Sequence, residues 1–389
     1  MDEQNGYYIK LTKTDREDRS LDPPVTTLTF LKGKPPLDLI RQRVKEILQH
    51  NPWLDGQYRK HPETRQFPSL WIPDTPNIEG HLETVRHPDL RPDTPIKKLQ
   101  RKLKPNLVNG GHGGRAKAPH PLFKVTVIST SHDRFCIVLS ICHTLADGYT
   151  FYCIYSMLAG TSPIRSLDAR RVDISEKVDE IVGAKRVSWF KSITTIVPFI
   201  IRVILNRNKP IFRYINVDWV AKQKRRYKPT DEVPFISTND VITSVFMDQF
   251  EMDCGLMAVD ARGRIPEVTK ELAGTYEVPV ILLQEEGFTA PQIRKTLLHR
   301  PNADWVTPGR LRSAMMNIGI VTSWASWDVD MPLEGCKFDV HIPLFALPMP
   351  PSFAVIWKAN KDNLAVLLNA KRKHLRRIDT HPCIGQPVL

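Results

Sequence analysis

Two strongly apolar runs near the middle of the chain restrict its fold more than any other feature. Residues 121–130 (PLFKVTVIST) and 134–142 (RFCIVLSIC) are β-forming runs separated by the polar tripeptide SHD. This pattern predicts a β-hairpin with two buried strands. The following run, 150–160 (TFYCIYSMLAG), predicts a buried helix that ends at a glycine. Between them lies HTLADG (143–148), so His143 is expected where the second strand ends and the chain turns into the helix.

Helix and strand patterns also alternate along the rest of the chain. Residues 36–58 open with apolar residues at helical spacing, namely Leu37, Ile40, Val44, Ile47 and Leu48. The Gly-rich run 109–121 is typical of a loop. The second half begins with a capped amphipathic helix, 233–247, and continues through runs that predict strands at 254–266, 278–284, 317–329 and 353–371. The alternation predicts an α/β or α+β chain without internal repeats.

The chain length predicts more than one folding unit. A chain of 389 residues is too long for one ordinary small core, so two subdomains are expected. We place the first subdomain at 1–165 and the second at 229–389. The remaining residues, 166–228, are expected to form a crossover linker.

The linker contains an unusually apolar segment, 188–205 (SWFKSITTIVPFIIRVIL). Its uncharged part, Ser192 to Ile201, is far shorter than the roughly 20 residues that span a bilayer. Two interpretations are open: a peripheral anchor in the membrane interface, or a helix packed on the core or over a substrate tunnel. We favour the packed helix, and in either case we expect 188–207 to be peripheral and not transmembrane.

Charge and cysteine usage limit the partners and the compartment. The chain has 55 basic and 42 acidic residues, a formal net charge of +13, which attracts nucleic acid, anionic lipid or a phosphate-bearing ligand, or serves solubility alone. The six cysteines form no CxxC pair, which favours a reducing compartment and argues against a zinc site. The polar N-terminal sequence has no apolar core of a signal peptide. We therefore expect a cytoplasmic protein, with peripheral membrane contact as an open alternative.

General base catalysis is the chemistry that best suits His143. An imidazole titrates near neutral pH, so it can accept a proton from an alcohol or an amine and return it later. Asp147 and Gly148 would stiffen the turn that holds it, although His-x3-Asp-Gly spacing alone fits a local structural pair as well. The chain has no G-x-S-x-G elbow, HExxH motif or P-loop. Metal binding is not expected either, because four histidines are irregularly spaced without acidic partners: His112, His120, His132 and His143.

The HTLADG hexapeptide resembles the HxxxDG motif of the chloramphenicol acetyltransferase-like superfamily. This group includes BAHD-type acyltransferases, to which the chain looks closest, and the condensation domains of nonribosomal peptide synthetases. Further segments resemble the family in the same order along the chain: LIRQRVKEILQHNPWLDGQY, HPLFKVTVIST, STNDVITSVFM, MAVDARGRIP and VTSWASW. The sequence departs from the family at Cys142, where condensation domains have a first histidine, and it lacks the DFGWG signature; CKFDVHIP (336–343) stands there instead.

The resemblance implies a fold and roles for particular residues. The fold would be two similar subdomains, each a mixed sheet with flanking helices, with a tunnel at their interface. His143 would be the general base. Asp147 would be structural and paired with an arginine, Arg262, with Arg264 as the alternative. Gly148 would keep the turn closely packed.

The resemblance also implies roles on the opposite wall of the tunnel. A hydroxyl of Thr322 or Ser323 would donate to the oxyanion of a tetrahedral intermediate, although both residues also fit an ordinary strand. Trp324 would line the tunnel or belong to the core.

The activity implied is acyl transfer from acyl-CoA, as a co-substrate, to a small-molecule alcohol or amine. It needs no covalent acyl-enzyme, metal or permanently bound cofactor. A monomer is expected, and no nucleic-acid partner. Two alternatives remain: a condensation-type domain that takes its acyl group from a carrier protein, and a non-catalytic, membrane-associated binding relative.

Overall fold

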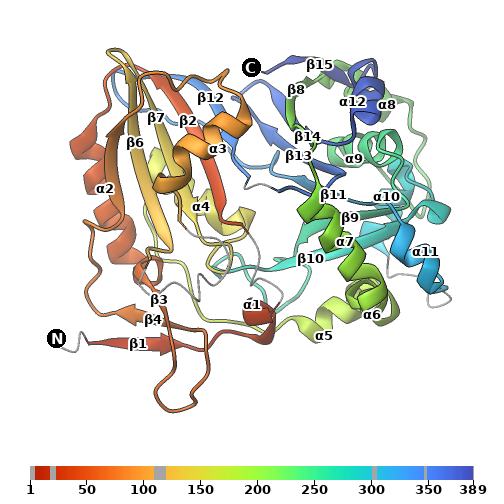
Figure 1. Cartoon of the computed structure of the whole chain (residues 1–389), viewed down its shortest axis with the longest axis horizontal. Coiled ribbons are helices and arrows are strands. Elements are labelled where there is room, and N and C mark those ends of the chain that lie inside the picture. The colour runs from red at the N-terminus through yellow and green to blue at the C-terminus, as the bar shows by residue number, and fades with distance from the viewer. Residues whose placement is uncertain (1–4, 18–22, 109–119, 300–304, 346–347, 389) are drawn as a thin grey trace.

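The structure is a computed structural model that describes residues 5–17, 23–108, 120–299, 305–345 and 348–388. These residues form two lobes, each built on a mixed sheet with flanking helices (Figure 1). The predicted α/β (α+β) class with two such subdomains is confirmed. The loop predicted at 109–121 lies almost entirely outside the described residues.

The N-terminal lobe contains a five-stranded sheet. Only the β5–β6 pair is parallel; the other neighbours are antiparallel. In spatial order the strands are β12 (Lys337–Pro343), β2 (Val25–Lys32), β7 (Arg134–Ile141), β6 (Phe123–Ser131) and β5 (Leu82–Arg86). The predicted hairpin is therefore present as β6 and β7, in the middle of the sheet, where long apolar strands are buried on both faces.

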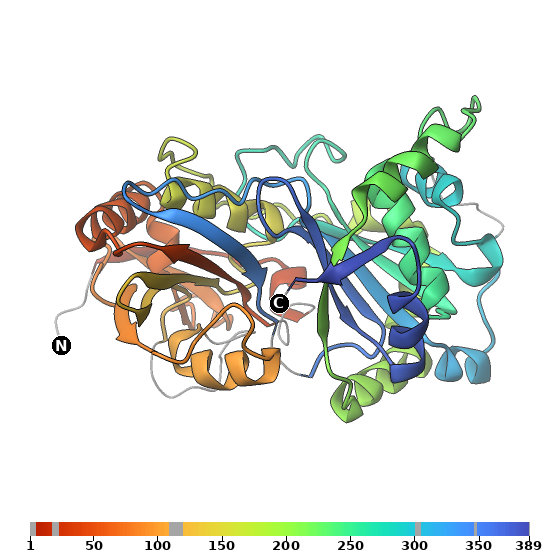
Figure 2. The same cartoon turned by 90° about the horizontal axis from the view of Figure 1, so that it is seen from above.

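Helices cover both faces of this sheet. Figure 2 shows α2 (Leu37–His50) and α4 (Gly148–Ala159) on one side and α3 (Ile96–Leu103) on the other. The lobe also contains α1 (Lys13–Glu17) and a small antiparallel sheet of β1 (Gly6–Ile9), β4 (Ser69–Pro73) and β3 (Gln57–Arg59). The buried face of α2 is the predicted one: Ile40, Val44, Ile47 and Leu48.

The C-terminal lobe contains a seven-stranded sheet. Strand β11 is parallel to its neighbours β9 and β13, and the remaining pairs are antiparallel. The order is β10 (Glu277–Leu283), β9 (Cys254–Asp260), β11 (Ile318–Ser323), β13 (Phe353–Lys358), β14 (Leu364–Asn369), β8 (Ile211–Ile215) and β15 (Ile384–Pro387).

Two separate apolar cores lie on this sheet. One packs under α8 (Val217–Arg226), α9 (Thr238–Gln249), α10 (Ala290–Leu298) and α12 (Arg372–Asp379). The second core lies between the sheet and a different set of helices: α5 (Ser175–Val178), α6 (Ala184–Lys191), α7 (Ile193–Leu205) and α11 (Arg310–Met315). The predicted cap of α9 is present as a capping box between Ser237 and Asp240, which satisfies the first free amides of the helix.

The sheets do not follow the predicted boundaries 1–165, 166–228 and 229–389. Strand β8 lies within the expected linker but pairs with β14 and β15 in the C-terminal sheet. Strand β12, from the second half, pairs with β2 in the N-terminal sheet. Its His341 is fully buried and bonds through its ring nitrogens to Thr29 (2.9 Å) and Tyr152 (3.1 Å). The second half of the chain is thus part of the N-terminal lobe's core.

The apolar segment 188–205 is not one helix. It divides at Ser192 into the end of α6 and the whole of α7. Among the described residues no single helix is long and apolar enough to cross a membrane; one pair, Ser175–Lys191 and Ile193–Leu205, meets the length and composition test together but is bent by 72°. Helix α7 packs on α11 and places Phe199 against the core, but Thr195 is its only buried residue, so most of its apolar side chains are exposed.

Candidate active site

The HTLADG turn is anchored at both ends by backbone hydrogen bonds. The amide of Cys142, just after β7, donates to the carbonyl of Leu122 (2.8 Å). The amide of Asp147 donates to the carbonyl of Gly274 in the other lobe (3.1 Å). Helix α4 then begins at Gly148, earlier than the predicted start at 150, because Asp147 acts as its N-cap.

Asp147 is buried and all its contacts are structural. One carboxylate oxygen accepts from the amide of Thr150 (2.9 Å), the capping bond of α4. The other accepts from Nη1 of Arg262 (2.7 Å) and from the amide of Tyr276 (2.9 Å). The aspartate therefore links the helix of one lobe to the second lobe.

Arg262 completes this connection from the side of the C-terminal lobe. Its guanidinium also donates to Asp260 (2.9 Å), to the Thr150 hydroxyl (3.0 Å) and to the carbonyl of Leu272. Burial lowers the pKa of Arg262, but the carboxylates of Asp147 and Asp260 raise it, and the net pKa lies above the ordinary value of arginine. The alternative partner, Arg264, instead donates to the carbonyl of Leu297 (3.1 Å).

Gly148 lies where a larger residue has no room. A Cβ atom at this position would come within 2.6 Å of the Trp327 ring and 3.4 Å of Nε1 of Trp324. Trp327 is stacked on Tyr152 with ring centroids 4.9 Å apart. The start of α4 therefore packs directly on the two tryptophans that follow β11.

His143 lies at the other end of the turn and differs from Asp147 in its surroundings. It is partly exposed, and its carbonyl accepts a hydrogen bond from the Thr275 hydroxyl. Its Nδ1 is buried and has no hydrogen-bond partner among the described residues. The ring is thus held by its backbone and by packing, while its side-chain nitrogens form no bond within the described structure.

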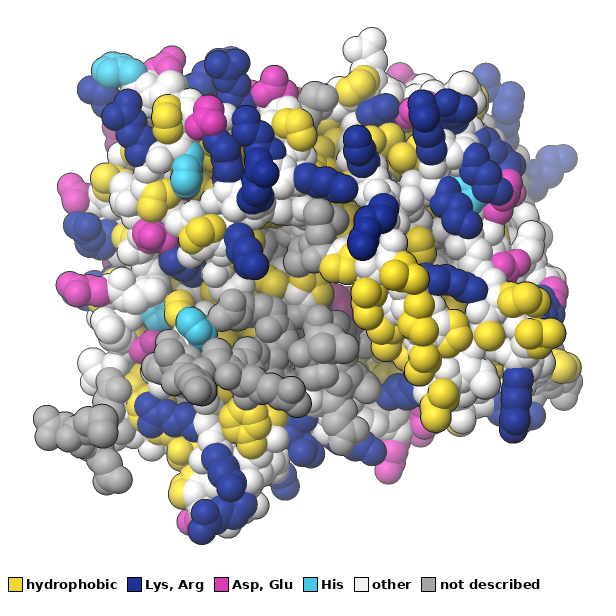
Figure 3. All heavy atoms as spheres, in the orientation of Figure 1, with side chains coloured by type: hydrophobic (Ala, Val, Ile, Leu, Met, Phe, Trp, Pro, Cys, Tyr) yellow, Lys and Arg dark blue, Asp and Glu magenta, His cyan; other side chains and the backbone are white. Residues whose placement is uncertain are grey.

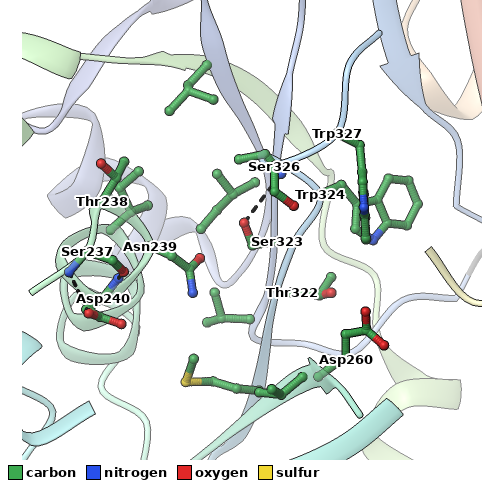
Figure 4. A pocket seen from close by; sticks show the side chains of 18 of the residues that line it. Ser237, Thr238, Asn239, Asp240, Asp260, Thr322, Ser323, Trp324, Ser326 and Trp327 are labelled. Atoms are coloured by element: carbon green, nitrogen blue, oxygen red, sulfur yellow. Dashed lines mark hydrogen bonds between the residues drawn. The ribbon is translucent and has the colours of Figure 1, made fainter. Parts of the chain in front are cut away.

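A cavity of about 830 Å³ opens beside the turn (Figure 4). Asp147 and Tyr149 contribute from the N-terminal lobe, and the ends of strands and helices of the other lobe form the rest. Of the predicted site residues the cavity is lined by Asp147, Arg262, Thr322, Ser323 and Trp324. His143 and Gly148 are not among its lining residues.

Thr322 and Ser323 point to opposite faces of β11, as neighbouring residues of a strand must. In Figure 4 Thr322 lies on the side of Asp260 and Trp324, and Ser323 on the side of Asn239. The Ser323 hydroxyl accepts weakly from the amide of Ala325 (3.5 Å), whereas the Thr322 hydroxyl has no partner among the described residues. Thr322 is therefore the freer donor of the two.

Basic side chains gather at the cavity, and sequence reasoning did not identify most of them. Arg262 and Arg294 are neutralised by buried or partly buried carboxylates. Four others form no ion pair with a described residue: Lys224, Arg264, Lys358 and Lys361. Burial and the neighbouring Arg294 lower the pKa of Arg264, which indicates a positive potential that a bound anion would relieve.

Further contacts of the site were missed because they involve backbone atoms. The stretch 272–276 supplies carbonyls to Arg262 and an amide to Asp147, and backbone groups carry no sequence signal. Trp327 was not assigned a role, although it ends the VTSWASW segment that resembles the family. Within the described part of the chain, no group of three or more His, Cys, Asp or Glu residues could hold a metal ion.

Comparison with solved structures identifies the fold. TRI101 of F. graminearum, solved with coenzyme A and deoxynivalenol, matches 96% of this chain and 97% of its own at 14% identity, with a TM-score of 0.61. Polyketide synthase associated protein 5 of Mycobacterium tuberculosis matches 97% and 98% at 13% identity, TM-score 0.61. The first condensation domain of the CDA synthetase matches 96% and 94% at 11% identity, TM-score 0.56.

These likenesses confirm, at the level of the fold, the resemblance carried by the sequence motifs. The chain has the two-lobed architecture of these solved structures along nearly its whole length. No protein-family model matches the sequence, and no curated protein matches it.

Proposed function

We propose that this protein transfers an acyl group from acyl-CoA to a hydroxyl or amine acceptor. One observation carries the proposal: the buried Asp147–Arg262 pair fixes the HTLADG turn beside a cavity that also presents a free hydroxyl and unpaired basic side chains. The solved complexes of TRI101 with coenzyme A support an acyl-CoA donor for a chain of the same fold.

In the proposed reaction the acceptor binds against His143, which lies outside the lining of the cavity, and gives a proton to it. The acceptor oxygen or nitrogen then attacks the thioester carbonyl and forms a tetrahedral oxyanion, to which Thr322 donates a hydrogen bond. The carbon–sulfur bond breaks, and the coenzyme A thiolate receives the proton from His143. No acyl-enzyme forms, because the acceptor attacks the thioester directly.

The unpaired basic side chains of the cavity suit the phosphates of coenzyme A. Lysine and arginine bind phosphate by charge-assisted hydrogen bonds. Lys358 and Lys361 lie at the turn between β13 and β14, while Lys224 and Arg264 come from other elements. Part of the basic excess of the chain would thus bind the phosphates of coenzyme A at this cavity.

A carrier-protein thioester is the second candidate donor, favoured by the likeness to a condensation domain. The two donors share the phosphopantetheine arm but differ in the nucleotide, since a carrier protein has no adenosine 3′-phosphate. Competition between coenzyme A and phosphopantetheine separates them: a CoA enzyme binds coenzyme A much more tightly, and a carrier-protein enzyme binds the two equally.

The direct test is release of free thiol from acetyl-CoA and longer acyl-CoAs with a panel of alcohols and amines. We expect thiol release that depends on an acceptor. If no acyl-CoA is turned over and neither coenzyme A nor phosphopantetheine raises the melting temperature, the protein is the non-catalytic relative instead.

A second experiment tests whether the lysines of the β13–β14 turn bind the phosphates of acyl-CoA. Lys358→Gln with Lys361→Gln should raise the KM for acyl-CoA roughly tenfold and leave kcat nearly unchanged, because the phosphates are bound equally in ground and transition states. The matched control is Lys97→Gln with Lys98→Gln, two exposed lysines of α3. Equal KM values for both double variants would place the nucleotide elsewhere.

The state of the cysteines supports a cytoplasmic location. None of the six forms a disulfide in the structure, and four of them are buried: Cys136, Cys142, Cys254 and Cys383. A chain that keeps free thiols suits a reducing compartment.

A further inference from the structure

Helix α7 has its apolar side turned away from the protein. Its exposed residues recur at helical spacing: Ile193, Val197, Ile200, Ile201, Ile204 and Leu205. Ile193 is 78% exposed and Leu205 is 64% exposed. A helix on the surface of a protein in water normally has the reverse arrangement, with its apolar stripe against the core.

The side of α7 that faces the protein is mixed, since Phe199 packs against the core beside polar residues. Thr195 is buried, and the Arg202 guanidinium donates to the carbonyls of Ala314 and Met316 at the end of α11. Asn206, which caps the helix, donates to the carbonyl of Met349 (2.8 Å). Hydrogen bonds therefore fix α7 in this orientation, and the outward apolar stripe is part of its folded arrangement.

The exposed apolar surface continues onto α11. Leu311 is 74% exposed and Met315 is 65% exposed, and α11 packs against α7. Figure 3 shows the apolar side chains of both helices on one face of the molecule. We call these eight residues the α7–α11 face. An exposed apolar patch of this extent marks an interaction surface.

The two chain segments that carry the α7–α11 face have no acidic residue, although Arg312 of α11 pairs with Glu285 from another segment. Neither 192–209 nor 305–317 contains an aspartate or a glutamate. Arg207 and Lys209 follow α7, and Arg310 begins α11; all three are exposed and form no ion pair with a described residue. The apolar surface therefore has a positively charged rim.

We propose that the α7–α11 face docks on the surface of an anionic lipid bilayer. An outward apolar stripe with a basic rim is the pattern of an interfacial helix, which places its apolar side chains among the acyl chains and its cations among anionic headgroups. A second copy of this chain fits less well, because a symmetric contact would bring two basic rims together. Because α7 is bent by 72° from the helical segment before it, it is a short element separate from that segment.

Vesicle binding by the full-length chain tests the proposal, and the assay contains no acyl-CoA, so its outcome is independent of the proposed activity. We expect the protein to float with vesicles of mixed phosphatidylcholine and phosphatidylserine, and far less with phosphatidylcholine alone. Val197→Gln, Ile201→Gln and Ile204→Gln together should reduce the partition coefficient at least about tenfold. The matched control is Leu37→Gln, Val217→Gln and Leu298→Gln, three exposed apolar residues scattered over other helices.

The basic rim is tested separately. Arg207→Gln with Lys209→Gln should weaken binding to the anionic vesicles and reduce its dependence on salt, while Lys97→Gln with Lys98→Gln should not. The proposal is wrong if the wild-type chain binds neither kind of vesicle, or if the α7 triple variant binds as well as its control. It is also wrong if the triple variant instead converts a dimer to a monomer in solution, because the face would then be a contact between copies.

Discussion

The two ends of the HTLADG turn differ in burial and in hydrogen bonding. At the far end, both carboxylate oxygens of Asp147 are bonded and Gly148 packs on Trp327 without space for a side chain. At the near end, His143 is partly exposed and its Nδ1 has no partner in the described structure. The anchoring Asp147 thus lies only four positions along the chain from an imidazole whose nitrogens have no hydrogen-bond partner among the described residues.

The difference separates two roles that the motif alone does not distinguish. Asp147 links the two lobes through a buried charge pair, so its substitution should lower the free energy of unfolding. The His143 side chain makes no hydrogen bond within the described structure, so its removal should lower the reaction rate and leave the stability unchanged. The predictions below test each end of the turn and then the helix that follows it.

The largest effect on stability is expected at the ion pair. Arg262→Ala should lower the free energy of unfolding by about 3–5 kcal/mol, because it leaves the buried Asp147 carboxylate without a charged partner. Asp147→Asn should cost less than Arg262→Ala, because Arg262 keeps its ion pair with Asp260. In the double variant the two losses should be less than additive. Denaturant unfolding of the four proteins of this cycle measures the coupling.

Arg264→Ala is the matched control for the cycle, since Arg264 lines the same cavity but, among the described residues, bonds only to a backbone carbonyl. It should lose much less stability than Arg262→Ala. Zero coupling between Asp147 and Arg262, together with a fully stable but inactive Asp147→Asn, would assign the aspartate to the chemistry.

A smaller effect, dependent on pH, is expected one turn into α4, where Tyr152 bonds to His341. Burial lowers the pKa of His341 to about 3. Unfolded histidine has a pKa of about 6.5, so between these values the unfolded chain binds more protons, and stability falls as the pH drops below about 6.5. From pH 7 to pH 5 this histidine alone should cost about 2 kcal/mol.

His341→Gln removes this titration, so its stability should change less over that pH range than that of the wild type. The exposed His50→Gln serves as the control and should keep the wild-type slope. Identical pH dependence in wild type and His341→Gln would show that the buried imidazole does not titrate on unfolding as described.

The smallest effect is expected at Gly148. Gly148→Ala should cost about 1–2 kcal/mol, because the added methyl group must displace the Trp327 ring from its stack on Tyr152. Gly80→Ala, at a position with nothing within 4 Å of the added atom, is the control. Thermal unfolding and tryptophan fluorescence follow the change; if both variants match the wild type, the close packing at the turn has no energetic weight.

Local structure was predictable wherever the sequence pattern is local. The hairpin β6–β7, the buried face of α2 and the capping box of α9 all follow from spacing within one element. The pairing of β12 with β2 and the place of β8 in the second sheet were not predictable, because strand order depends on contacts between distant parts of the chain. The orientation of α7 was missed for the same reason: periodicity identifies an apolar stripe but not the direction it faces.

The candidate site follows the same division. The resemblance implied an arginine partner for Asp147, but only the three-dimensional structure selects Arg262 over Arg264, because the chain turns directly after β9 ends at Asp260. The three-dimensional structure also distinguishes Thr322 from Ser323 as the donor, because the two side chains point to opposite faces of β11. The bonds from 272–276 could not be predicted, since most are made by backbone atoms.

The central claim is that His143 acts in the chemistry and Asp147 in the structure. The most direct test is the rate of acceptor-dependent thiol release from acyl-CoA by His143→Ala, measured beside its melting temperature, with the exposed His132→Ala as control. The account predicts a rate lower by on the order of 10²–10⁴-fold, with an unchanged melting temperature. A folded His143→Ala variant that turns over acyl-CoA at the wild-type rate would contradict it.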